Sequence, residues 1–329
     1  MNTSSAVPLV FLHVVADRNG QPSGLLFDIG EGDANALLSL FEEENFTALH
    51  TQIPCLYRPG IDPALIAALQ ELGWKELAAG SLHVADTQFD KVMPPAVAWV
   101  TGNWCMAPPA KALGPQAASR ALALQLVQQV AADADTHEIE ALLRRDPTLS
   151  YHLLKLVNSL GMGTGRKITS FSQAILILGR QQLRRWLNLM LFAAKEGDLR
   201  SAMLLSRVAV RARMLELLAK ERGLDKNTQE QGFMAGMFSL LGILFGMPLA
   251  EVLAPLAISD TVQKALLEHK GDLGALLQML ENAEQGNLAG LAEQLSAMQL
   301  APEEFNAVMV DAYNWMLGVV RETQGNANG

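Results

Sequence analysis

The sequence predicts an α+β protein in which a small α/β domain, residues 1–110, precedes a larger all-α domain, residues 111–325. Two observations carry this prediction. Strand-like and helix-like segments alternate only in the first hundred residues, whereas the rest of the chain keeps the 3.6-residue period of helices. A length of 329 residues also suits two domains of ordinary size. The remaining residues, 326–329, are expected to form a disordered tail.

The N-terminal domain opens with a predicted β-hairpin, because two apolar segments flank the turn sequence RNGQP. One of the helices that follow has clear boundaries, with Asp62 at the N-cap, Pro63 in the first position and Gly73 after the end. The predicted strands are residues 9–17, 23–30, 82–86 and 96–102, and the predicted helices are residues 36–45 and 63–73.

The C-terminal domain is predicted to be a succession of helices, because apolar residues recur along it at helical spacing. The predicted helices are residues 118–133, 137–145, 146–158, 174–179, 180–194, 201–223, 232–246 and 301–322.

The acidic charge is concentrated in the N-terminal domain. Residues 1–110 contain four Lys or Arg against twelve Asp or Glu, which accounts for nearly all of the net charge of −9. A phosphate backbone attracts clustered cations, so this composition argues against nucleic-acid binding there. Cys55 and Cys105 show neither metal-ligand spacing nor a disulfide framework, and the N-terminus lacks a basic leader. We expect a cytoplasmic protein that is not exported.

One segment, residues 232–250, carries no charge over nineteen positions, close to the roughly 20 that span a bilayer. Pro248 would end a helix there, four glycines dilute its apolar character, and no basic cluster flanks it. We therefore expect no membrane span, and we expect residues 232–246, GFMAGMFSLLGILFG, to form a buried helix within the all-α domain.

Three stretches together resemble the HDOD domain, a divergent branch of the HD metal-dependent phosphohydrolase superfamily. They are DPTLSYHLLKLVNS with the following KITSFSQAILILGRQQLRRW, then LLSRVAVRARMLELLA, then GFMAGMFSLLGILFG. In catalytic HD proteins, His and Asp at comparable places bind a metal that activates water. The resemblance places Ser239 and Leu240 at the His-Asp pair and Leu205 near an earlier His position.

The resemblance implies that phosphohydrolase chemistry is absent, because leucine cannot ligate a metal. None of the six histidines lies in an HD pair or an HxxxH pattern, and none is assigned a catalytic role. We expect no catalytic residue, no metal site and no cofactor. The implied role is a regulatory scaffold in signal transduction that binds other proteins through the helical domain. The identity of the partner and the formation of a homodimer are left open.

The end of the N-terminal domain, AWVTGNWCMAPPA, is similar to the closing segment of EAL cyclic di-GMP phosphodiesterase domains. About 110 residues are only half of an EAL barrel, and the Glu-x-Leu strand and the paired aspartates expected for its metal site are missing. The region is interpreted as a truncated, degenerate EAL relative or an unrelated α/β module.

Basic residues in the helical domain suggest a second candidate site. Arg166, Lys167, Arg180, Arg184 and Arg185 could converge on a surface that receives an anion, a nucleotide or an acidic partner. Arg207 and Arg211 share a helix face. The alternative is that these cations form the solvated side of amphipathic helices. The rival functions are a receptor for cyclic di-GMP or another nucleotide and a residual metal-dependent phosphohydrolase or phosphodiesterase.

Overall fold

The computed structural model describes residues 7–90, 92–109, 125–126, 128–129, 132, 134–143, 179, 185, 188–189, 199–254, 256 and 258–324. The strands are β1 (Val10–Ala16), β2 (Pro22–Ile29), β3 (Cys55–Tyr57), β4 (Lys75–Glu76), β5 (Leu82–Val84) and β6 (Trp99–Thr101). The α-helices are α1 (Leu38–Glu42), α2 (Glu44–Gln52), α3 (Pro63–Glu71), α5 (Thr136–Leu143), α8 (Ser201–Glu221), α9 (Lys226–Phe238), α10 (Leu241–Phe245), α11 (Leu249–Leu253), α12 (Asp260–Glu268), α13 (Gly271–Glu284), α14 (Leu288–Ala297) and α15 (Pro302–Gln324). Short 3-10 helices cover Ala34–Leu37 and Trp104–Met106.

The protein is a mixed structure, as predicted, with its strands in the first 101 residues and only helices among the described elements that follow. The hairpin, the strands near residues 82 and 99 and the helices starting at Pro63, Ser201 and Pro302 are confirmed. The predicted domain boundary at residues 110 and 111, the tail 326–329 and the predicted helices 146–158 and 174–179, apart from Gly179, lie outside the described residues.

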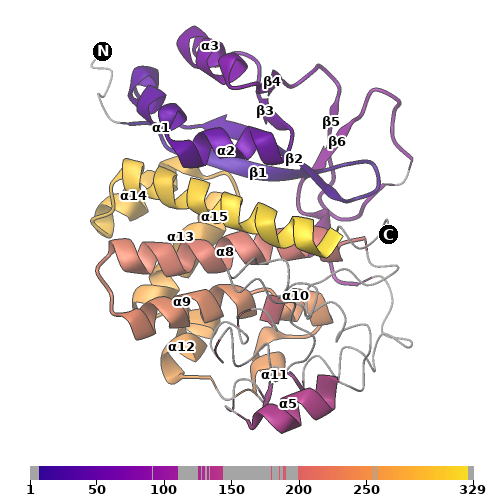
Figure 1. Ribbon diagram of the computed structural model, residues 1–329, viewed down its shortest axis with the longest axis vertical. Helices are drawn as coiled ribbons and strands as arrows, with labels where there is room; N and C mark the ends of the chain where they lie inside the picture. Colours follow the sequence, from indigo (N-terminus) through magenta and orange to yellow (C-terminus); the bar gives the residue numbers. More distant parts are fainter. Residues whose placement is uncertain are drawn as a thin grey trace, which may run out of the picture.

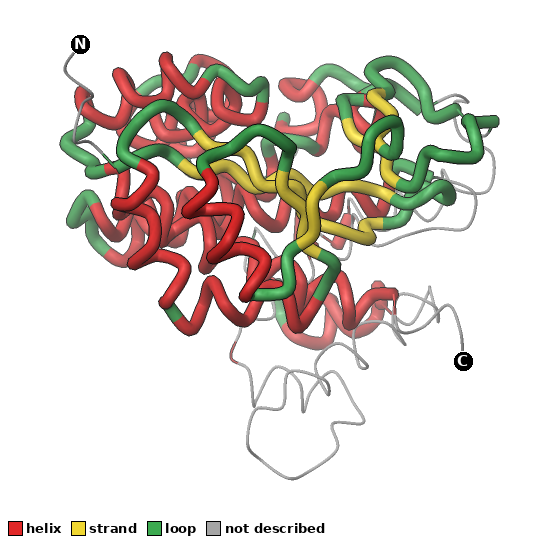
Figure 2. Tube along the Cα trace, turned by 90° about the horizontal axis from the view of Figure 1, so that it is seen from above, coloured by secondary structure: helices red, strands yellow, loops and turns green. Residues whose placement is uncertain are grey.

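The six strands form one sheet in the order β4-β3-β2-β1-β6-β5. Figure 2 shows the strands in yellow, with helices next to them. β1 runs antiparallel to its neighbours β2 and β6, while β2, β3 and β4 are parallel, as are β5 and β6. β3 and β4 were not predicted, because two or three residues are too few to show an alternating pattern. Large aromatic side chains pack beside the sheet, including Phe27 and Phe46, the latter stacked on Trp74 at 5.3 Å.

α15 covers the free edge of β1. β1 is paired with β6 only at Ala16, so the rest of that edge needs other hydrogen-bond partners. The amide of Asn306 accepts a hydrogen bond from the Val10 N–H at 2.9 Å and donates one to the Pro8 carbonyl at 2.9 Å. One and two helical turns further along, Met309 accepts from the Leu12 N–H and Tyr313 donates to the Leu12 carbonyl. The sheet and the C-terminal helix therefore share one core.

The central helix is α8, which lies between α15 and α9 (Figure 1). Most of its residues are buried, and it also contacts α13 and β1. Gly236 of α9 lets the two helices approach closely, because a Cβ at that position would lie 2.3 Å from the Cα of Ala212. α8 thus touches both the sheet and the segment that follows α9.

The apolar segment 232–246 is buried but is not the single helix that was predicted. α9 ends at Phe238 and α10 begins at Leu241. At the break, the Ser239 hydroxyl donates to the Gly236 carbonyl at 2.7 Å, which gives the hydroxyl a backbone partner inside the last turn. The second helix ends at Gly246, whose φ is 66°.

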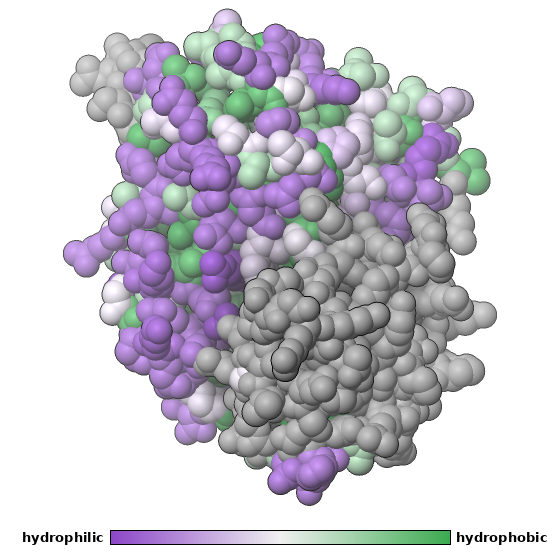
Figure 3. All heavy atoms as spheres, in the orientation of Figure 1, coloured by the Kyte–Doolittle hydropathy of each residue, from purple (hydrophilic) through white to green (hydrophobic). Residues whose placement is uncertain are grey.

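In the described part of the chain, no helix combines the length and apolar character needed to cross a bilayer. The described residues on the face shown in Figure 3 are mostly hydrophilic, with apolar side chains scattered among them.

Candidate functional site

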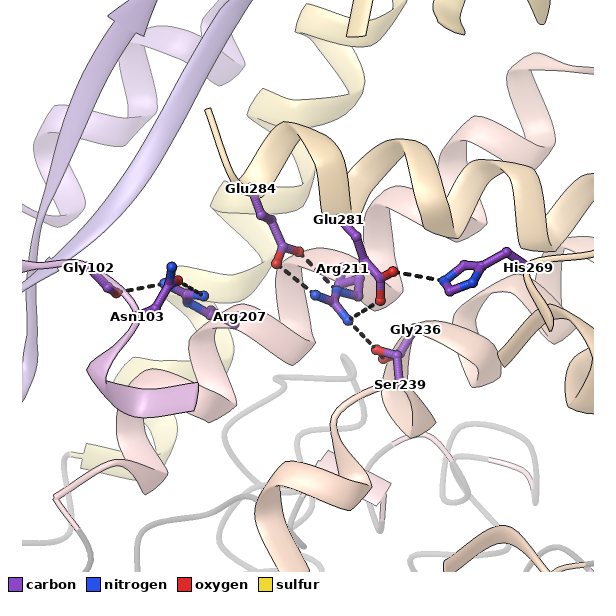
Figure 4. Close-up of polar contacts among 9 residues, drawn as sticks. All are labelled: Gly102, Asn103, Arg207, Arg211, Gly236, Ser239, His269, Glu281 and Glu284. Carbon is purple, nitrogen blue, oxygen red and sulfur yellow. Dashed lines mark hydrogen bonds and ion pairs between the residues drawn. The ribbon is translucent and has the colours of Figure 1, made fainter. Parts of the chain in front are cut away.

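The three positions assigned by the HD resemblance lie on α8 and at the end of α9. Leu205 and Leu240 are 2% and 1% exposed and belong to the main hydrophobic core. Neither offers a donor or acceptor side-chain atom. Ser239 stands at the break between α9 and α10, and its hydroxyl points toward α8 (Figure 4).

The Ser239 hydroxyl accepts a hydrogen bond from Arg211 of α8. Nη1 of Arg211 donates to Ser239 Oγ at 2.9 Å and to Glu281 Oε1 at 3.2 Å. Nε and Nη2 donate to the two carboxylate oxygens of Glu284 at 2.9 and 2.7 Å. This is a bidentate pair, the strongest geometry between a guanidinium and a carboxylate. All the carboxylates come from α13, so α8, α9 and α13 are joined at one guanidinium (Figure 4).

The electrostatics of Arg211 follow from its burial. Its side chain is only 3% exposed. Burial alone would lower its pKa, but the charge of Glu284, with its hydrogen bond, and the charge of Glu281 raise the pKa above its ordinary value. Arg211 therefore remains a buried cation whose charge is offset by two carboxylates.

His269 also belongs to the network of polar side chains around Arg211, through its contact with Glu281. Its Nε2 lies 2.9 Å from Glu281 Oε2, while Glu281 Oε1 accepts from Arg211. His269 follows α12 in a left-handed conformation with φ 51°, which turns the chain into α13. The carboxylate of Glu281 is thus shared between a guanidinium and an imidazole.

The residues at this place do not fit the divalent metal that an HD-type site implies. Leu205 and Leu240 supply no ligand atom, and the Ser239 hydroxyl accepts a hydrogen bond from a cation. The nearby carboxylates of Glu281 and Glu284 are already bonded to Arg211. A second cation placed among them would be repelled by the guanidinium. Among the residues that the structure describes, no three His, Cys, Asp or Glu side chains gather as a metal site.

Four of the five residues in the predicted basic surface, Arg166, Lys167, Arg180 and Arg184, lie outside the described residues. Arg185 is described and is 17% exposed. It forms an ion pair with Glu216 of α8, and its guanidinium lies 4.5 Å from the centre of the Phe233 ring. The charge of Arg185 is thus engaged inside the helical part, and the basic surface stays a prediction.

The alternative that Arg211 belongs to a solvated helix face is wrong, because its guanidinium is buried. Sequence reasoning missed the role of this residue and of Glu281 and Glu284. A signal was available: Arg211 interrupts a helix whose flanking residues are mostly apolar, and Glu281 and Glu284 have the i,i+3 spacing that places two residues on one face of a helix. The sequence could not show that the two faces meet.

Comparison with known proteins identified a family model and two relatives that match this chain. The model of the HDOD domain matches residues 115–296. The chain is 29% identical over 201 residues to the cyclic di-GMP phosphodiesterase CdgJ of Vibrio cholerae, a stretch covering 61% of this chain and 46% of that protein. It is 31% identical over 176 residues to the uncharacterized protein YuxH of Bacillus subtilis, covering 53% of this chain and 42% of that protein. The chain therefore spans less than half the length of these curated relatives.

Proposed function

The chain belongs to the HDOD domain family, and on that premise we propose that it is a non-catalytic regulatory protein whose helical domain binds other proteins in bacterial signal transduction. The observation that carries this proposal is the buried Arg211 guanidinium at the Ser239 hydroxyl. A site built around a paired protein cation has a structural role and lacks the open coordination position that metal-dependent hydrolysis requires.

The pathway we propose is cyclic di-GMP signalling, in the cytoplasm. The support is the name of the Vibrio cholerae relative, a cyclic di-GMP phosphodiesterase, whose alignment covers 46% of its own length. The family match begins at residue 115, so the predicted likeness of residues 1–110 to a degenerate EAL domain remains a prediction without support from the family match.

Hydrolysis and metal content test the non-catalytic role directly. The purified full chain would be incubated with manganese, iron, zinc or magnesium, freed of excess metal, and assayed for metal content and for cleavage of cyclic di-GMP, with the Vibrio cholerae relative as positive control. We expect neither stoichiometric metal nor turnover. Tightly bound metal together with phosphodiester cleavage would establish the rival enzyme function instead.

The scaffold role needs a second test, on partner binding. Proteins crosslinked to the full chain in cell extract would be compared between the wild type and the double variant Arg180→Glu with Arg184→Glu, with Arg222→Glu as a matched charge-reversal control. Arg222 pairs with Asp272 at the far end of α8. Partners lost only in the double variant would support recognition through the predicted basic surface. Equal capture by all three proteins would refute that surface.

A cyclic di-GMP receptor is the second candidate, again because of the name of the relative. Calorimetry of the full chain with cyclic di-GMP should then give saturable heat that the Arg180→Glu, Arg184→Glu variant loses. If only the heat of dilution is observed, the chain is not a cyclic di-GMP receptor, and the protein-scaffold function is the proposal that stands.

A further inference from the structure

A small cavity lies where the sheet meets the helical part of the molecule. Its volume is about 60 Å³, and it is lined by residues of β1, β6, α8, α13 and α15. Much of the wall is apolar, including Phe11 of β1 with Val210 and Met214 of α8. The charged groups in the wall include Arg207, Arg211 and Glu284.

The two arginines in this wall differ in how their charges are compensated. Arg211 is bonded to two carboxylates, as described above. Arg207, one turn earlier on α8, donates from Nη1 to Asn103 Oδ1 at 3.0 Å and from Nη2 to the Gly102 carbonyl at 2.8 Å (Figure 4). Both acceptors are neutral, and no carboxylate in the described part of the chain forms an ion pair with Arg207. One cation in the cavity wall thus lacks a counter-charge.

An uncompensated guanidinium beside an apolar wall favours an amphipathic anion. The carboxylate of such a molecule could bind the guanidinium, and its alkyl part could replace water against Phe11 and Val210. A cavity of about 150 Å³ accommodates benzene, so the present volume limits the buried part to fewer atoms. We propose that the cavity between the sheet and α8 binds a short-chain carboxylate, with its head group at Arg207 and its alkyl chain against the apolar wall.

The position of the cavity gives this binding a consequence for the whole protein. Gly102 and Asn103 directly follow β6, so Arg207 links the end of a strand to the central helix. A carboxylate that draws the Arg207 guanidinium toward itself would change its hydrogen bonds to Gly102 and Asn103. The inference goes beyond the scaffold function and does not depend on it, because it rests on Arg207 rather than on the pairing of Arg211 and is measured without a partner protein.

The test compares an anion with its neutral counterpart. The full chain would be titrated with sodium butyrate and with butyramide by calorimetry, against sodium chloride of equal ionic strength. We expect saturable butyrate binding at about millimolar concentration and binding of butyramide at least about tenfold weaker, because the neutral amide lacks the negative charge that pairs with the guanidinium. Equal binding of the two compounds, or no saturation by butyrate at roughly a hundred times that concentration, would overturn the proposal.

Variants locate the site. Arg207→Gln should weaken butyrate binding at least about tenfold, whereas Arg222→Gln, outside the cavity, should leave it unchanged. Since Arg207→Gln also removes contacts with Gly102 and Asn103, a second variant retains the arginine: Val210→Phe fills the cavity and should abolish binding. Butyrate binding that survives both variants contradicts the assigned site. Inorganic phosphate that saturates where butyrate does not would refute a carboxylate ligand.

Discussion

The side chain of Asn306 bonds to the backbone of Val10 across 296 positions of the sequence. Its amide accepts from the Val10 N–H and donates to the Pro8 carbonyl, the two hydrogen bonds that a neighbouring strand would make. Asn306 is 1% exposed, so neither backbone group can turn to water instead. This residue is what allows a helix to complete the edge of a sheet.

Substitution of Asn306 should therefore destabilise the protein strongly. Asn306→Leu keeps the branched shape of the side chain but leaves two buried backbone groups unpaired, and we expect a loss of about 2 to 4 kcal/mol in the free energy of unfolding. Urea denaturation followed by circular dichroism measures it. Glu303→Gln, at an exposed position of the same helix, should change the free energy by less than about 0.5 kcal/mol. A loss that small for Asn306→Leu would show that the edge is not held by this amide.

The ion pair between Arg211 and Glu284 predicts that the stability effects of substitutions at these two positions are strongly coupled. Arg211→Met leaves Glu284 and Glu281 without their buried partner, and we expect a loss of about 3 to 5 kcal/mol in the free energy of unfolding. Adding Glu284→Gln removes one of the uncompensated charges, so the double variant should be more stable than the sum of the two single effects. Denaturant unfolding of the four proteins gives the coupling energy. Simple additivity would mean that the two residues do not form the pair described.

We expect a glycine-to-alanine substitution to have opposite effects on stability at two helical positions, Gly236 and Gly318. Gly236→Ala places a Cβ 2.3 Å from the Cα of Ala212, so α8 and α9 must move apart, at a cost of at least about 2 kcal/mol. Gly318→Ala, in α15, meets no atom within 4 Å and should stabilise the protein by about 0.5 to 1 kcal/mol. Thermal unfolding of both variants tests the contrast. Similar effects at both positions would argue against the close helix contact.

The carboxylate of Asp28 predicts a loss of stability in acid. Burial alone would raise its pKa, but hydrogen bonds and charges from His13 and Arg58 lower it below the ordinary value of 3.8. The unfolded chain therefore binds a proton at a higher pH than the folded one, so this contribution to stability is complete above about pH 4 and falls away below it. Urea unfolding at successive pH values should show a shallower acid loss in Asp28→Asn. The exposed Asp86→Asn variant serves as control, and identical curves for both would contradict the prediction.

The sequence predicted the elements whose signals are local. The hairpin has its turn between two apolar segments, and the helix at Pro63 has its cap at Asp62, whose side chain accepts from the Ala64 N–H. It did not predict that α15 covers β1 or that Arg211 meets Glu284, because such contacts join residues far apart and depend on how finished elements pack. Ser239, Leu240 and Leu205 were located only through a family resemblance. The hydrogen bond from Arg211 to Ser239 has no counterpart in the sequence pattern.

Restoring the two ligand types at Ser239 and Leu240 should not restore a metal site. In Ser239→His with Leu240→Asp, Leu205 still lacks a ligand atom, and the Arg211 guanidinium, which donates to the Ser239 hydroxyl in the native protein, would lie beside the new imidazole. The imidazole would then accept from the guanidinium, and the positive charge would oppose a divalent ion. We expect no tightly bound metal by mass spectrometry after exposure to manganese, iron or zinc. Adding Arg211→Met to the double variant separates the two obstacles, because metal uptake only in the triple variant would identify the guanidinium as the dominant one. Stoichiometric metal in the double variant would instead show that Arg211 does not prevent metal binding at these positions.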